Sequence, residues 1–243
     1  MKILITGASS GLGAELARQY ASTQNHLVLL ARREDKLYSL RKELFEKCQD
    51  IDIIVADVTD FKATQQKLQK IENLDMVILN AGIALGQSYD TTPIDEFVKL
   101  YNVNLLANHA ILEVLLPKFE KHSSATIVFI SSLASLLSIP GSEVYSSSKR
   151  ALNAYAEGLY YKYRSKGIEV FTILPGFIKS ELTDKNDFYM PFLMSTQEGV
   201  AKIKKAIEKK KYFYPFPLRF YLLIKFINFL PRSLKEKIVF QLS

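Results

Sequence analysis

The sequence has little of what disulfide bonding, metal chemistry or membrane insertion requires. Its single cysteine, Cys48, excludes an internal disulfide, and the three scattered histidines (His26, His109 and His122) offer no metal-ligand spacing. The chain starts on an apolar run at Lys2, without a charged leader and a long apolar segment. These features predict a cytoplasmic protein without a metal site.

Internal repeats, linkers and low-complexity stretches are also missing from the 243 residues. With 48% apolar residues, the chain can bury a sizeable core. We therefore expect a single domain over residues 1–211, with residues 212–243 as an amphipathic C-terminal appendage of the same domain.

The net charge of +7 is unevenly distributed along the chain. From residue 201 onward, 11 Lys or Arg face 2 Asp or Glu, which gives +9 there and leaves −2 for the first 200 residues. This basic end is rich in Phe, Tyr and Leu, and its apolar residues run together. It predicts an acidic surface as a partner, with a membrane favoured over nucleic acid.

Short apolar runs alternate with amphipathic helical patterns over the first 175 residues. Continuous apolar strands separated by helices indicate a doubly wound parallel sheet, a three-layer α/β/α Rossmann fold. Ligands of such sheets bind at the carboxyl ends of the strands. The expected strands are 2–6, 26–31, 52–58, 75–80, 125–132 and 169–175, and the expected helices are 11–23, 34–48, 61–71, 94–119 and 145–167.

A glycine-rich turn, TGASSGLG at 6–13, directly follows the first expected strand. Gly7, Gly11 and Gly13 let the backbone turn sharply and approach a pyrophosphate, while the following helix offers N–H groups at its N-terminus. The pattern predicts a dinucleotide site, and a tight turn without a ligand is the alternative. The cofactor site is expected to include Ser9, Ser10 and Leu12 of this turn as well.

Two arginines end the second expected strand and bear on the choice of coenzyme. Arg32 and Arg33 favour NADP(H), because arginine accommodates a 2′-phosphate whereas an acidic residue would bond the ribose 2′-hydroxyl of NAD(H). NAD(H) use, with both arginines solvated at a helix start, is the alternative. Later strand ends offer further contacts for adenine and ribose: Asp57, Val58, Asn80, Ala81 and Gly82.

The stretch YSSSK at 145–149 places Tyr145 and Lys149 one helical turn apart. The same Tyr-x-x-x-Lys spacing recurs at 38–42 and at 221–225, so the spacing alone identifies no site.

The surrounding motifs resemble those of the short-chain dehydrogenase/reductase family, in its single-domain, NADP-preferring branch. They are TGASSGLG, NAG at 80–82, YNVNLL, FISS, YSSSK and PGFIKS at 175–180, and together they cover roughly residues 2 to 180. The resemblance implies catalytic roles for Asn104, Ser132, Tyr145 and Lys149. It adds the following residues to the cofactor site: Tyr145, Lys149, Pro175, Gly176, Ile178 and Ser180.

The activity implied by this resemblance is hydride transfer between NADP(H) and a ketone, an aldehyde or a secondary alcohol. An unperturbed tyrosine has a pKa of ~10, and the Lys149 ammonium with an oxidised nicotinamide would lower it, so that Tyr145 serves as general acid and base. Ser132 would bond the substrate oxygen, and Asn104 would bend its helix and help to hold a water. A non-catalytic NADP-binding sensor and a membrane-associated scaffold are the alternatives.

Residues 181–199 follow the last of these motifs and are rich in Phe, Met and Leu. In the family this segment covers the substrate, and its apolar residues favour a bulky hydrophobic carbonyl compound or alcohol over a small sugar as the small-molecule substrate. Ordinary core packing of the segment is the alternative.

The apolar run at 218–230 contains Arg219 and Lys225 and is shorter than the ~20 residues that span a bilayer. With the cluster KKAIEKKK at 204–211, it predicts an interfacial anchor, peripheral on the inner face of the membrane. A subunit contact and a lid over the active site are the other interpretations.

We expect a homodimer or homotetramer, because members of the family usually associate through the two helices that here contain Asn104 and Tyr145. The second of them carries apolar residues around much of its circumference. The residues concerned are Leu152, Tyr155, Leu159, Tyr160 and Tyr163.

Overall fold

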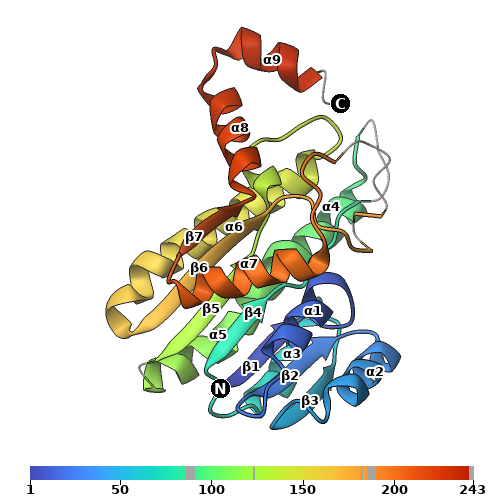
Figure 1. The fold of residues 1–243 in the computed structure, drawn as a ribbon, viewed down its shortest axis with the longest axis vertical. Helices are drawn as coiled ribbons and strands as arrows, with labels where there is room; N and C mark the ends of the chain where they lie inside the picture. The colour runs from blue at the N-terminus through green and yellow to red at the C-terminus, as the bar shows by residue number, and fades with distance from the viewer. Residues whose placement is uncertain (86–90, 123, 182, 185–189, 241–243) are drawn as a thin grey trace.

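The computed structural model describes residues 1–243 except 86–90, 123, 182, 185–189 and 241–243. The described residues form a seven-stranded sheet in the order β3-β2-β1-β4-β5-β6-β7, in which every pairing is parallel (Figure 1). The order reverses between β1 and β4, which places the ligand-binding crevice of such a sheet at their carboxyl ends. The strands are β1 (Lys2–Thr6), β2 (His26–Ala31), β3 (Asp50–Val55), β4 (Met76–Leu79), β5 (Ala125–Ile130), β6 (Ile168–Pro175) and β7 (Phe213–Phe216).

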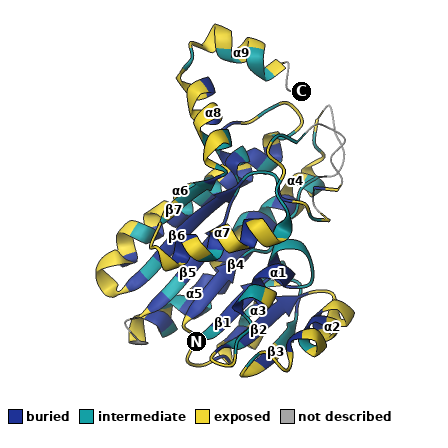
Figure 2. Cartoon of the chain, in the orientation of Figure 1, coloured by how far each residue is buried: buried dark blue, intermediate teal, exposed yellow. Residues whose placement is uncertain are grey.

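Helices cover both faces of the sheet, so the central strands are apolar on both sides. One layer contains α1 (Gly11–Tyr20), α2 (Glu34–Leu44) and α7 (Thr196–Glu208), and the other contains α3 (Phe61–Gln69), α5 (Ala107–His122) and α6 (Glu143–Tyr163). Figure 2 shows the sheet as the buried centre of the molecule. The three-layer α/β/α prediction is confirmed.

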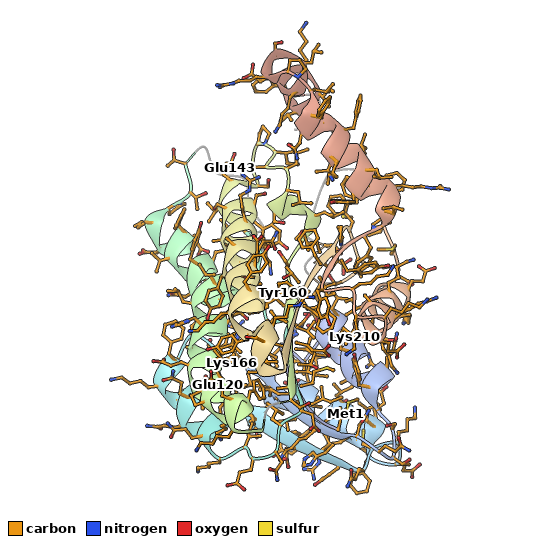
Figure 3. All side chains as sticks on the ribbon, turned by 90° about the vertical axis from the view of Figure 1, so that its left-hand side faces the viewer. Met1, Glu120, Glu143, Tyr160, Lys166 and Lys210 are labelled. Carbon is orange, nitrogen blue, oxygen red and sulfur yellow. The ribbon has the colours of Figure 1, made fainter. Side chains whose placement is uncertain are left out.

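Fully buried aromatic side chains fill both layers of this core. Phe129 and Phe119 lie in the layer of α5 and α6, and Phe171 lies in the layer of α7. Burying a side chain of this size stabilises the fold by about 1.5–3 kcal/mol. Figure 3 shows α6 running from Glu143 past Tyr160, and Lys166 just beyond its end forms an ion pair with Glu120 of α5.

The sheet extends one strand further than the sequence indicates. The expected boundary at residue 212 falls beside strand β7, whose residues pair with β6 from Thr172↔Phe213 to Pro175↔Phe216. Four residues give too short a pattern to recognise, and Pro215 argues against a central strand. Because β7 is the edge strand, the missing N–H of Pro215 is tolerated, and the helical appendage starts only at Leu218.

Helix α7 also replaces part of the expected basic anchor. The KKAIEKKK cluster at 204–211 is the end of α7 and the turn after it, and α7 buries Val200 and Ile203 against the sheet layer. Lys204 donates to the carbonyl of Gln19, so this lysine serves a contact within the domain. The cluster is therefore separate from the helices that follow β7.

Helices α8 (Leu218–Phe229) and α9 (Arg232–Phe240) project from the domain beyond the end of the sheet (Figure 1). Ile224 and Ile227 are buried against Leu133, Leu137 and Leu174, which anchors α8 to the body. Within the described part of the chain, none of the helices is long and apolar enough to cross a membrane. The outer face of α8 carries exposed apolar residues: Leu218, Leu222, Leu223, Phe226 and Phe229.

Candidate active site

The glycine-rich turn joins β1 to α1 in a conformation that requires glycine. Gly7 and Gly11 have φ angles of 67° and 51°, which side-chain-bearing residues rarely adopt. A Cβ added at Gly13 would lie 2.1 Å from the carbonyl oxygen of Gly7, so α1 packs directly on the turn. The N-terminus of α1 consequently faces the carboxyl edge of the sheet, where it favours a negative charge.

Two side chains, Thr6 at the end of β1 and Asn80 directly after β4, hold this turn in place by hydrogen bonds. The Thr6 hydroxyl accepts from the backbone N–H groups of Asn80 and Ala81, both at 3.0 Å. The Asn80 amide donates to the carbonyl of Thr6 at 3.0 Å. Asn80 therefore supports the turn, and Ala81 and Gly82 follow it along the crevice.

A cleft of about 890 Å³ runs over the carboxyl ends of the strands. It combines a cradle that added Cβ atoms would fill, two arginines and a tyrosine–lysine pair, so its residues fit a dinucleotide. Gly13 and Asn104 lie outside the lining, but Gly13 packs on Gly7 and Asn104 bonds Ile83, which both belong to it. The lining contains all other predicted site residues: Gly7, Ser9, Ser10, Gly11, Leu12, Arg32, Arg33, Asp57, Val58, Asn80, Ala81, Gly82, Ser132, Tyr145, Lys149, Pro175, Gly176, Ile178 and Ser180.

Each of the two arginines after β2 is paired with a carboxylate. Arg32 lies 3.3 Å from Asp57, and this ion pair and hydrogen bonds from Thr59 hold the pKa of Asp57 below its usual value against the opposing effect of burial. Arg33 donates to Ser9 at 3.2 Å and pairs with Glu181 at 3.0 Å. The sequence did not single out Glu181, which is 148 residues from Arg33 along the chain.

Tyr145, Ser132 and Lys149 meet at the other end of the cleft. Ser132 follows β5 and hydrogen-bonds the phenol of Tyr145, which is half-buried on the first turn of α6. Nζ of Lys149 lies 5.9 Å from the centre of the Tyr145 ring and donates to the carbonyl of Ile130 at 3.0 Å. The tertiary structure thus brings together the end of a strand and two positions of a helix.

Burial dominates the acidity of this pair in the coenzyme-free chain. Desolvation raises the pKa of Tyr145 above its ordinary value, and the hydrogen bond with Ser132 opposes this rise. Desolvation also lowers the pKa of Lys149 to about 8. Loss of hydration penalises the charged form of each group. The expected lowering of the Tyr145 pKa requires an oxidised nicotinamide beside the ammonium, so it stays a prediction for the coenzyme-bound protein.

Asn104 lies in a π-helical segment, Asn102–Leu106, between α4 (Ile94–Tyr101) and α5. Its Oδ1 accepts from the N–H of Ile83 at 2.9 Å, and its amide donates to the Ile83 carbonyl at 3.0 Å. A Cβ added at Gly82 would lie 3.4 Å from both Asn104 Oδ1 and Lys149 Nζ. The expected irregularity of the helix is present, and Gly82 leaves space between the two side chains.

The loop after β6 closes the cleft near the glycine-rich turn. Ser180, predicted as a cofactor contact, donates to the carbonyl of Ile178 at 3.3 Å. The buried hydroxyl of Thr183 accepts from the N–H of Ser180 at 2.9 Å and holds this loop. Of the expected substrate cover at 181–199, residues 182 and 185–189 lie outside the described residues.

A separate polar group lies at the opposite end of the strands. Nε2 of His26 is 2.8 Å from Asp52 and 3.9 Å from Asp50, although the sequence spacing indicates no ligand set. The parallel register brings His26 beside Asp50 on the neighbouring strand. Both carboxylates are exposed, and the hydrogen bond between His26 and Asp52 accounts for the grouping.

Comparison with known proteins identifies the family. The short chain dehydrogenase model matches residues 1–188. The chain belongs to the short-chain dehydrogenase/reductase family. It is 32% identical over 235 residues to an uncharacterised oxidoreductase of Myxococcus xanthus, covering 95% of this chain and 93% of the relative.

Solved short-chain dehydrogenases share the fold of this family member. The enzyme of Sphingobium yanoikuyae in complex with NADPH superposes with a TM-score of 0.84 at 24% identity, covering 96% of this chain and 97% of that one. A family member of Burkholderia phymatum in complex with NAD gives 0.82 at 20% identity, with 92% and 91% covered. The present chain is an NAD(P)-dependent oxidoreductase.

Proposed function

We propose that this protein transfers hydride between NADP(H) and a hydrophobic ketone, aldehyde or secondary alcohol. The observation that carries the proposal is the convergence of Ser132, Tyr145 and Lys149 at one end of the cleft that begins at the glycine-rich turn. A bound coenzyme would lie along this cleft and supply or accept the hydride. The side chains of the protein must then orient the substrate oxygen and supply or accept its proton.

Tyr145 is the general acid of carbonyl reduction in this proposal. Its hydroxyl donates a proton to the substrate oxygen, while the Ser132 hydroxyl bonds the same oxygen and orients it. The Lys149 ammonium favours the resulting phenolate and binds the coenzyme ribose. With a pKa of about 8, this amine is mostly protonated at neutral pH.

Proton return to Tyr145 would pass beside Gly82. The position of a Cβ on this glycine is 3.4 Å from Lys149 Nζ and 3.4 Å from Asn104 Oδ1. A water bonded to Lys149 Nζ would connect the buried amine to solvent. Asn104 would then position the water, because its amide is itself fixed by the backbone of Ile83.

The coenzyme preference for NADP(H) rests on the end of β2. Arg32 and Arg33 line the cleft there, and guanidinium groups suit a 2′-phosphate. The solved neighbour with NADPH supports this choice, and the one with NAD keeps NAD(H) as the second candidate.

A hydrophobic substrate is supported by aromatic rings beside the tyrosine end of the cleft. Phe220 of α8 stacks on Phe177 at 5.7 Å between ring centres and lies 5.9 Å from the ring of Phe192. A Cβ added at Gly176, which lines the cleft, would lie 3.1 Å from Phe220. Helix α8 thus contributes to an apolar wall next to the cleft, which favours a bulky apolar carbonyl compound.

The test is turnover of purified protein with NADPH and a panel of apolar ketones and aldehydes. We expect NADPH oxidation, reduced at least about 100-fold in Tyr145→Phe, because general acid catalysis contributes 10²–10⁴-fold. NADPH binding, measured by coenzyme fluorescence, should persist in this variant. Binding without turnover on any substrate would instead support the sensor.

Two assembly properties complete the proposal. The outer face of α8, with Arg219 and Lys225 beside its exposed apolar residues, would associate peripherally with an anionic membrane surface.

The chain would also form a homodimer or homotetramer. The subunit contact would not involve Leu152, Leu159 and Tyr163, which were expected at it, because their side chains are buried within the core of the chain itself. The contact would instead involve Val98 of α4 and Leu106 of the π-helical segment, whose side chains are exposed.

A further inference from the structure

Glu181 closes a cluster of polar side chains over the glycine-rich turn. Its carboxylate lies 3.0 Å from Nη1 of Arg33 and also forms a hydrogen bond with Ser10. Arg33 donates to the hydroxyls of Ser9, at 3.2 Å, and of Ser10. The Arg33 guanidinium is thus shared between the turn and a carboxylate that comes from the loop after β6.

The loop that carries Glu181 is packed against the turn. Ser180 directly precedes Glu181 in this loop, and a Cβ added at Gly11 of the turn would lie 3.3 Å from Cβ of Ser180. The Arg33 and Glu181 side chains are 42% and 59% exposed, so solvent screens their ion pair and a ligand can reach it. Both residues line the cleft.

The other arginine is held differently. Arg32 pairs with Asp57 at 3.3 Å, but Asp57 also accepts hydrogen bonds from the N–H and the hydroxyl of Thr59, at 2.9 and 2.7 Å. Asp57 is therefore fixed by its own loop. The hydrogen bond with Ser10, the hydrogen bond and charge of Arg33 and the charge of Lys36 hold the pKa of Glu181 below its usual value against the opposing effect of burial.

We propose that Glu181 sets the selectivity of this site between NADP(H) and NAD(H), because its carboxylate competes with a 2′-phosphate for Arg33. The inference rests on the proposed use of NADP(H). A 2′-phosphate carries −1.5 to −2 charges, so it is attracted by the guanidinium and repelled by Glu181. The 2′-hydroxyl of NAD(H) carries no charge and displaces nothing. Glu181 therefore weakens the binding of NADP(H) and leaves that of NAD(H) unchanged. It thus reduces the preference for NADP(H) over NAD(H) that the two arginines create.

The experiment is a fluorescence titration of the coenzyme-free protein with NADPH and, separately, with NADH. Removing one negative charge near the phosphate in Glu181→Gln should tighten NADPH binding about 3- to 10-fold. The affinity for NADH should stay within about twofold. Glu46→Gln is the matched control, because it removes the same charge from an exposed site beyond the end of α2 and should change neither affinity.

A second pair of variants isolates the competition for Arg33. In an Arg33→Gln background, Glu181→Gln should tighten NADPH binding less than it does in the wild type, since the shared guanidinium is gone and only the direct repulsion between Glu181 and the phosphate remains. Three results would overturn the role of Glu181: weaker NADPH binding in Glu181→Gln, equal tightening of both coenzymes, or no change in either. Wild-type protein that binds NADH but not NADPH would overturn the coenzyme preference and this role together. Circular dichroism verifies that each variant is folded.

Discussion

Lys149 Nζ lies 5.9 Å from the centre of the Tyr145 ring and donates to the carbonyl of Ile130 at 3.0 Å. The amine is thus tied to the end of β5, with only 4% of the lysine exposed. Burial makes the charged forms of both residues costly. A negative charge that enters the cleft would favour the Lys149 ammonium, and a positive charge would favour the Tyr145 phenolate.

The buried amine predicts a pH dependence of stability. The pKa of Lys149 is about 8 in the folded chain and near the ordinary 10.5 when unfolded, so between these values the unfolded state binds more protons. This group's contribution to the free energy of unfolding therefore rises as pH increases from 8 to 10.5, by up to about 3 kcal/mol.

Urea unfolding of wild type and Lys149→Met at several pH values between 7 and 10.5 measures this contribution. The stability of the wild type relative to the variant should increase with pH above 8 and level off below it. A constant difference across this range would show that the amine is not desolvated in the fold.

Close packing of the turn predicts a severe effect of Gly13→Ala. The new Cβ would lie 2.1 Å from the Gly7 oxygen and 2.8 Å from Nδ2 of Asn80, so α1 must shift. We expect a loss of about 1–3 kcal/mol in the free energy of unfolding from such overpacking, and NADPH binding weakened at least about tenfold by displacement of the turn.

Gly158→Ala is the control for this substitution. Gly158 lies inside α6, and an added Cβ would meet no atom within 4 Å apart from the surrounding backbone of its own helix, so alanine should stabilise the chain by about 0.5–1 kcal/mol. Denaturant unfolding and fluorescence titration give both quantities. Equal behaviour of the two variants would contradict the account of the turn.

The exposed face of α8 predicts association with anionic lipid. Phe229 is 89% exposed and Phe226 is 59% exposed, with Lys225 beside them. Replacing both phenylalanines by Glu should abolish flotation with vesicles of phosphatidylglycerol and phosphatidylcholine, because it removes apolar contact and adds repulsion. Phe45→Glu, on an exposed residue after α2, should leave flotation unchanged. Flotation that survives the double substitution would remove the anchor.

The apolar residues on α4 and the π-helical segment predict a subunit contact. Val98 and Leu106 are 46% and 44% exposed. Leu106→Glu should shift the mass measured by light scattering from an oligomer toward the monomer, because a buried unpaired charge is costly at an interface. Tyr38→Glu, at a 51% exposed position on α2, is the control and should keep the oligomer. A monomeric wild type would contradict the prediction.

Local patterns were sufficient for much of the fold and of the cleft. The apolar runs located β1 and β2 within the correct bounds, because a strand buried on both faces must be continuously apolar. The turn at 6–13 was recognisable because its glycines serve backbone geometry within one short segment. Helix α7 was missed because its lysines were interpreted as part of a basic tail, although Val200 and Ile203 mark a buried face.

The sequence by itself determined the alternation of strands and helices and the glycine-rich turn, because each depends on residues close together in the chain. The prediction that Tyr145 and Lys149 form the catalytic pair came from motifs spread over residues 2 to 180, since the local Tyr-x-x-x-Lys spacing occurs three times. Only the tertiary structure decided that β7 completes the sheet, that desolvation raises the pKa of Tyr145 in the coenzyme-free chain, and that Glu181 reaches Arg33. These three outcomes depend on distant segments meeting, and on burial that no local pattern records.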